Sequence, residues 1–228
     1  MVTLMTFDFT PLLLTFKLAF VTTVILTVIG IPLAYWLAFT QRRWKFLIEP
    51  LVSLPLVLPP TVLGFYILLL FSPRYPLGSF LETHFDVRVV FTFLGLVIGS
   101  VLFSLPFMVN PLKAGFESIP RVLIDASETL GKSRRETLFK VILPSMKPSL
   151  LTGIIMSFAH TIGEFGVVLM IGGNIPDKTR VVSIAIFNEV EALNYANAHV
   201  YSMVIIVISF ILLTGLYWVN RTSKGRLF

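Results

Sequence analysis

Two ionisable residues inside an apolar stretch are the first candidates for chemistry. His160 and Glu164 lie in SFAHTIGEFG, four residues apart, so a continuous helix would place them on one face. A metal site of an intramembrane hydrolase could use both, but zinc chemistry needs three protein ligands, and the sequence has no HExxH motif. Two other interpretations stay open for this stretch, which also holds Ser157 and Gly163. Glu164 is a hydrogen-bonded structural group, or the four residues line a polar pathway through the membrane.

A second candidate is the charged segment, residues 113–147, which holds seven of the 18 Lys and Arg residues. Its pattern predicts a helix, a glycine break and a second helix. Gly131 suits a left-handed helix end, and Ser133 with Glu136 forms a capping box that starts the second helix. Pro144 is expected to end that helix. The first helix would carry an apolar face formed by Val122, Leu123, Ala126 and Leu130.

The composition is that of a membrane protein. Of the 228 residues 56% are hydrophobic and 13% are charged, and the mean hydropathy is +0.89. The net charge of +6 is explained by basic cytoplasmic loops and gives no reason to expect nucleic-acid binding. The chain has no cysteine, which excludes disulfides and thiolate metal sites within it.

Apolar runs of spanning length predict five transmembrane helices. The second run holds Pro50, Pro55, Pro59 and Pro60, so it should be broken, which a membrane tolerates only where the freed carbonyls face protein or a watery cavity. Short helices are expected near residues 79–84 and 181–190, between spans. The five runs cover about residues 10–39, 47–71, 89–112, 148–171 and 199–219.

The distribution of basic residues predicts the orientation of the chain. Thirteen of the 18 Lys and Arg residues fall in the loop 41–45, in the charged segment and after residue 220, all on one side of a five-span chain. The positive-inside rule places that side in the cytoplasm, with the N terminus outside and the C terminus inside. The expected fold is an all-α polytopic membrane protein, with one domain at residues 10–220 and a basic tail at 221–228.

The charged segment resembles the EAA coupling loop of importer-type ABC permeases. In that family Glu-Ala-Ala is followed by a Gly four residues after the second Ala, and by Ile-x-Leu-Pro ten residues after that Gly. Here DAS, Gly131 and VILP keep the spacing. The resemblance implies the type I ABC importer permease fold, with this loop docked in a groove of the ATPase subunit. The residues that it marks for coupling, together with two neighbouring arginines, are Asp125, Ala126, Ser127, Gly131, Arg134, Arg135, Val141, Leu143 and Pro144.

Two further stretches resemble the oxyanion permeases of the same family. SFAHTIGEFG and GGNIPDKTR look like the patterns F-A-R-x-x-G-E-F-G and I-P-x-x-T, and LPLVLPPTVLGFYILL is most similar to molybdate permeases. His160 stands where that pattern usually has Arg. The resemblance implies molybdate import, with sulfate, thiosulfate or tungstate as alternative cargo. The expected pathway stretches are the proline-rich second span, residues 95–104 and residues 157–166.

The sequence contains no GxxxxGK[ST] phosphate loop, so ATP must be bound by another chain. The resemblance implies a transporter subunit that is not itself an enzyme and holds no cofactor, located in the cytoplasmic (inner) membrane. Its expected partners are two ATP-binding subunits, a second copy of itself in a homodimer, an extracytoplasmic solute-binding protein and membrane lipids. Alternative classes are a channel or secondary transporter, and an intramembrane hydrolase that uses His160 and Glu164. A secondary transporter usually shows internal repeats, and none is recognised here.

Overall fold

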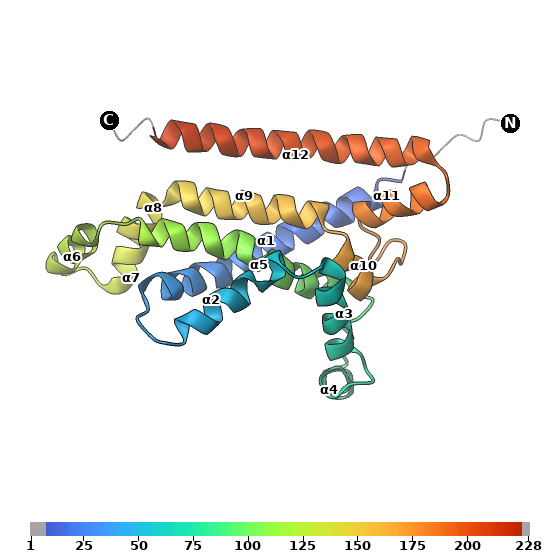
Figure 1. Cartoon of the computed structure of the whole chain (residues 1–228), viewed down its shortest axis with the longest axis horizontal. Coiled ribbons are helices and arrows are strands. Elements are labelled where there is room, and N and C mark those ends of the chain that lie inside the picture. Colours follow the sequence, from blue (N-terminus) through green and yellow to red (C-terminus); the bar gives the residue numbers. More distant parts are fainter. Residues whose placement is uncertain (1–7, 225–228) are drawn as a thin grey trace.

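The computed structural model describes the backbone of residues 8–224, and all regular elements in that range are helices (Figure 1). The four longest run side by side along the long axis of the molecule. They pack around α5, which contacts both α1 and α9, while α12 lies on the outside against α9 and α11. The four helices are α1 (Thr10–Phe39), α5 (Phe93–Glu117), α9 (Lys147–Gly163) and α12 (Tyr195–Lys224).

The core is divided into two main apolar clusters along these helices. One cluster gathers Leu96 of α5 with Val167 and Ile171, and the other gathers Leu112 and Phe116 near the charged segment. Serine and threonine side chains of α1, α5 and α9 are buried as well. The interior is therefore apolar at both ends and contains hydroxyl groups along the packed helices.

The structure agrees with five membrane spans. Among the described residues α1, α5 and α12 are each long and apolar enough to cross a membrane, and the number is up to five if each of two bent helix pairs counts as one span. One bent pair is the predicted broken second span, in which α2 (Lys45–Ser53) and η1 (Leu54–Leu56) turn by 110° into α3 (Pro60–Phe71). The bend falls at two consecutive prolines, Pro59 before α3 and Pro60 as its first residue. The α-helical conformation is disfavoured for a residue that precedes proline, so the first helix cannot easily continue through this point.

The helix α3 leaves the bundle and leads to α4 (Pro76–Phe85), which projects from the molecule in Figure 1. A short helix was expected at this place, and it is confirmed. α3 packs closely on α10 (Gly166–Gly172): a Cβ atom at Gly64 would lie 2.8 Å from Cβ of Met170, and one at Gly166 would lie 2.7 Å from Cβ of Pro60. Glycine at both positions lets the two backbones approach.

The fourth span differs from its prediction. A single helix was expected over residues 148–171, but α9 ends at Gly163 and α10 begins only at Gly166. The second predicted short helix is confirmed as α11 (Val182–Glu191). The last span is longer than expected, since α12 continues to Lys224 and includes the first part of the predicted basic tail, while residues 225–228 lie outside the described residues.

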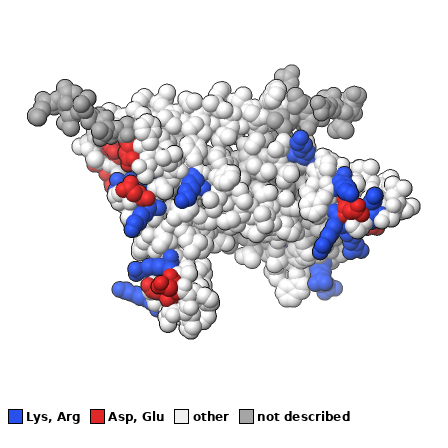
Figure 2. All heavy atoms as spheres, turned by 180° about the vertical axis from the view of Figure 1, so that it is seen from behind, with Lys and Arg blue, Asp and Glu red and all other residues white. Residues whose placement is uncertain are grey.

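Charged side chains gather at the ends of the molecule. Figure 2 shows them in clusters separated by a broad surface that is mostly uncharged. One cluster belongs to the charged segment, and a smaller one includes the ion pair between Arg88 and Glu82 near α4. Such a pattern is typical of a chain whose middle zone faces lipid.

Candidate functional site

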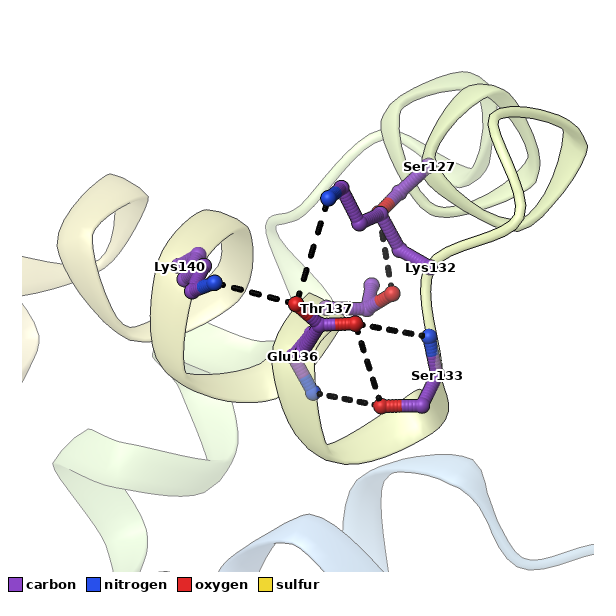
Figure 3. Close-up of polar contacts among 6 residues, drawn as sticks. All are labelled: Ser127, Lys132, Ser133, Glu136, Thr137 and Lys140. Carbon is purple, nitrogen blue, oxygen red and sulfur yellow. Dashed lines mark hydrogen bonds and ion pairs between the residues drawn. The ribbon is translucent and has the colours of Figure 1, made fainter.

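The charged segment forms the predicted helix, glycine break and second helix. α6 (Arg121–Thr129) ends before Gly131, whose φ of +75° is left-handed, and α7 (Arg134–Thr137) begins after Ser133. The capping box is confirmed: Ser133 Oγ accepts from the Glu136 N–H at 3.3 Å, and the Ser133 N–H donates to Glu136 Oε2 at 3.4 Å (Figure 3). The end of the first helix and the start of the second are therefore set by signals in the local sequence.

Internal contacts hold α6 and α7 together (Figure 3). The buried hydroxyls of Ser127 and Thr137 form a hydrogen bond of 2.9 Å between the two helices. Glu136 contacts Lys140 at 3.0 Å and Lys132 at 3.9 Å. The hydrogen bond from Lys140, followed by that from the Ser133 backbone, lowers the pKa of Glu136, so its carboxylate stays charged well into acid. The turn has a fixed shape.

The apolar face of α6 points away from the protein. Val122 and Leu130 expose 74% and 79% of their surface, and Leu123 is exposed as well. Phe139, on the next helical segment, is 65% exposed. Large apolar side chains gathered on an otherwise charged surface mark a site where another surface binds. The helix therefore offers an apolar surface bordered by charges.

The residues singled out for coupling are placed differently. Ser127 is buried and shapes the turn, and Val141 and Leu143 are half-buried. The remainder are accessible to a partner: Asp125, Ala126, Gly131, Arg134, Arg135 and Pro144.

Pro144 does not end the second helix, contrary to the expectation. α7 continues through the wider turn of η2 (Leu138–Ile142) into α8 (Leu143–Ser145), and the chain bends only at Met146, where α9 starts at an angle of 77°. The reason is that Pro144 lies in the first turn of α8, directly after the π-type turn. A missing N–H leaves no hydrogen bond broken at such a position.

The second candidate stretch does not form one helical face. Glu164 follows the end of α9 and has an extended backbone (φ −69°, ψ 132°), so the predicted four-residue helical spacing between His160 and Glu164 is wrong. The hydroxyl of Ser183 on α11 donates to the Glu164 carbonyl at 2.6 Å and satisfies a backbone group released by the break. Gly163 is exposed at this point.

His160 is held by neighbours on α5. Its Nδ1 atom lies 2.9 Å from Ser104 Oγ, and its ring stacks on Phe107 with centroids 3.9 Å apart. Ser104 Oγ also lies 3.0 Å from Thr161 Oγ1, which donates to the Ser157 carbonyl at 2.9 Å. One serine thus links a partly buried histidine to the backbone of α9.

The Glu164 side chain is buried at 4% exposure, and within the described residues neither carboxylate oxygen is in hydrogen-bond geometry with a partner. The Ser100 hydroxyl neighbours it but is likewise buried without such a partner. The choice between a structural role and a pathway role for Glu164 stays a prediction. The described part of the chain has no cluster of three or more His, Cys, Asp or Glu residues that could hold a metal ion.

A ring of ion pairs at the other end of α5 did not emerge from the sequence. Lys45 and Glu49 of α2 meet Lys113 and Glu117 of α5, so that each lysine contacts both glutamates. Both helices carry their Lys and Glu four residues apart, and this spacing was the available signal. What the sequence could not show is that the two pairs face each other.

Comparison with known proteins places these features in a family. The profile of the family described as binding-protein-dependent transport system inner membrane component matches residues 30–223. The chain is 47% identical to the molybdenum transport system permease protein ModB of Azotobacter vinelandii, over 96% of each chain. It is 35% identical to the sulfate transport system permease protein CysT of Salmonella typhimurium, over 86% of this chain and 70% of that protein.

The fold is also similar to a solved transporter structure. A bacterial alginate ABC transporter, crystallised in complex with an alginate pentasaccharide-bound periplasmic protein, superposes with a TM-score of 0.77 at 15% identity. The match covers 96% of this chain and 80% of that one. At this identity the likeness concerns the fold alone, and it is the fold of an ABC importer permease.

Proposed function

Because the chain belongs to the family of binding-protein-dependent transport system inner membrane components, we propose that it is the permease subunit that carries molybdate through an ABC importer. It is a multi-pass protein of the cytoplasmic membrane. The observation that carries the choice of cargo is the 47% identity to a molybdenum permease, which extends over 96% of both chains. Sulfate is the second candidate, supported by the weaker likeness to a sulfate permease.

The exposed face of α6 is the proposed contact with the ATPase. It offers the apolar side chains of Val122 and Leu130, while Arg134 and Arg135 are exposed on the neighbouring helix α7, which starts at the capping box. A rigid, partly apolar surface can enter a groove with little loss of conformational freedom. ATP is bound by that partner, because this chain has no GxxxxGK[ST] phosphate loop.

Two copies of the chain would enclose the pathway on a two-fold axis, because five helices are too few to surround a hydrated path. A binding protein outside the membrane would deliver the oxyanion, as the family description and the alginate transporter suggest. ATP binding would draw the two charged segments together and rock the attached helices. The binding protein supplies the tight binding, so the permease needs only weak contacts with the cargo.

The interpretation as an intramembrane hydrolase has no support in the geometry. His160 Nδ1 lies at hydrogen-bond distance from the Ser104 hydroxyl, and the His160 ring stacks on Phe107. Glu164 lies beyond the end of the same helix. Neither arrangement supplies an open metal position or an activated nucleophile.

Uptake of labelled molybdate tests the proposal. Cells without their own importer would receive this chain, its ATPase and its binding protein, with sulfate or tungstate added separately in large excess. We expect excess tungstate to inhibit molybdate uptake and excess sulfate to leave it unchanged. Uptake abolished by sulfate would instead identify a sulfate-type importer. Absence of uptake with the ATPase demonstrably bound would refute the oxyanion assignment.

A further inference from the structure

The ion-pair ring between α2 and α5 has a geometry suited to clamping two helices. Lys45 Nζ lies 3.7 Å from Glu49 Oε1 and 3.9 Å from Glu117 Oε1. Lys113 Nζ lies 3.7 Å from Glu117 Oε1 and contacts Glu49 Oε1 directly. Positive and negative groups alternate around the ring, so every neighbouring pair attracts.

The helix α2 has little else to hold it. Of its nine residues only Val52 is buried. Beside the ring, a cleft of about 440 Å³ separates α2 from α5 and is lined in part by Ser53, Asn110 and Lys113. Val52 belongs to the apolar cluster around Leu112 and Phe116, so this one side chain anchors α2 in the core while much of the helix borders the cleft. The ring is therefore a principal link between this helix and α5.

The ring also lies between the two parts of the molecule that must move together. Glu117 ends α5 and is four residues before Arg121, where α6 begins. Glu49 is on the helix that leads, through η1 and the bend of 110°, to α3. Any displacement of α6 that shifts the end of α5 reaches the ring before it reaches the bent span.

We propose that this ring transmits the movement of the charged segment to the broken second span, with Lys45, Glu49, Lys113 and Glu117 as positioning residues for transport. The inference rests on the proposed function, because it requires an ATPase docked on α6. The four side chains are 25–45% exposed, so solvent screens each pair in part and the ring acts through all four contacts together. The ring stays closed while α5 and α2 move as a unit.

The test follows the broken second span with a single thiol. The chain has no cysteine, so Thr61→Cys introduces the only one, at an exposed position of α3 just beyond the bend of 110°. The complex with ATPase is reconstituted, and the rate of maleimide labelling is compared without nucleotide and after trapping with ATP and vanadate. We expect the rate to change on trapping. An unchanged rate would overturn the proposal, because the broken second span would not follow the ATPase.

Charge variants then ask whether the ring carries this response. Lys113→Glu leaves three acids and one base, and we expect the nucleotide dependence to be lost while the nucleotide-free rate stays the same. Exchanging all four charges, with Lys45→Glu, Glu49→Lys, Lys113→Glu and Glu117→Lys, restores the alternation and should restore the response. A response that survives Lys113→Glu, or that the fourfold exchange fails to restore, overturns the proposal.

Two controls separate this mechanism from simple destabilisation and from the choice of cargo. Glu117→Gln removes one corner and should weaken the response, whereas Glu82→Lys breaks the ion pair with Arg88 near α4 and should leave it intact. If labelling depends on nucleotide but molybdate is not taken up, the molybdate assignment is refuted and the transmitting role of the ring is supported. If molybdate is taken up but the nucleotide-dependent change in labelling rate is the same with and without Lys113→Glu, the transmitting role of the ring is refuted and the molybdate assignment is supported.

Discussion

At the scale of single residues, Gly131 has the clearest conformational requirement in the charged segment. Its φ is +75°, and a Cβ atom added there would meet no atom within 4 Å. A substitution therefore costs backbone strain alone, roughly 1–2 kcal/mol for a residue with an ordinary side chain. Asparagine adopts this conformation more readily than β-branched residues do.

We predict that Gly131→Val reduces both ATPase binding and uptake, by about tenfold for a cost near 1.4 kcal/mol. The mutated turn no longer holds α6 and α7 in their relative positions. Gly131→Asn is the matched variant and should retain most activity. The measurement is the amount of ATPase that co-purifies with each permease, together with uptake. Equal loss in both variants would show that the left-handed backbone is not the cause.

A second prediction concerns the hydroxyl that holds His160. Ser104→Ala leaves His160 Nδ1 without its partner inside the protein, which costs about 1–3 kcal/mol. Ser157→Ala is the control, since Ser157 Oγ is equally buried but bonds to nothing among the described residues. Thermal unfolding of the purified protein in detergent should show a lower midpoint only for Ser104→Ala. Equal shifts would mean that packing alone explains the effect.

The same two regions show how far residue-level prediction reached. The capping box depends on Ser133 and Glu136, which are only three positions apart, so the sequence was sufficient to predict it. The relation between His160 and Glu164 depends on where α9 ends. That end is accompanied by a hydrogen bond from Ser183, nineteen positions further along the chain. A local periodicity rule has no access to such a contact.

At the scale of helices, the apolar face of α6 leads to a prediction about binding. If Val122 and Leu130 enter a groove of the ATPase, each buries a side chain worth about 1.5–3 kcal/mol. Val122→Asp and Leu130→Asp should therefore weaken ATPase binding by about tenfold or more. Both side chains are mostly exposed in the isolated chain, so the fold should persist.

The measurement is titration of the purified permease with its ATPase. Arg121→Asp places an acid on the opposite side of α6 from the apolar face and should bind nearly as well as the parent. If the three variants bind alike, the apolar face contacts something other than the ATPase, such as the membrane surface.

Within the membrane spans, the break that the sequence predicted is the one that prolines mark. Pro59 and Pro60 fall at the bend of 110° between η1 and α3, and the sequence predicted that break. The break between α9 and α10 contains no proline. There Gly166 permits close packing on Pro60 of α3, a contact between residues far apart in the chain. Hydropathy located α1, α5, α12 and the bent second span, because length and composition are sufficient for that purpose, whereas the fourth span ends earlier than it predicted.

At the scale of the whole molecule, the orientation in the membrane remains a prediction of the charge distribution. Thirteen Lys and Arg residues lie on the side of the charged segment and five on the other, which places the charged segment in the cytoplasm. The proposed mechanism requires this orientation, because ATP is available on that side. The helix α4 would then lie outside.

Single cysteines in the cysteine-free chain can test this arrangement directly. Thr83→Cys places a thiol on exposed α4, and Lys132→Cys places one on the exposed turn after α6. A membrane-impermeant maleimide should label Thr83→Cys in intact cells and Lys132→Cys only after permeabilisation, while detergent should make both reactive. The opposite pattern would invert the topology and remove the ATPase from reach of α6. The predicted pattern would place the charged segment, the ion-pair ring and the start of the bent span on the side where ATP is hydrolysed.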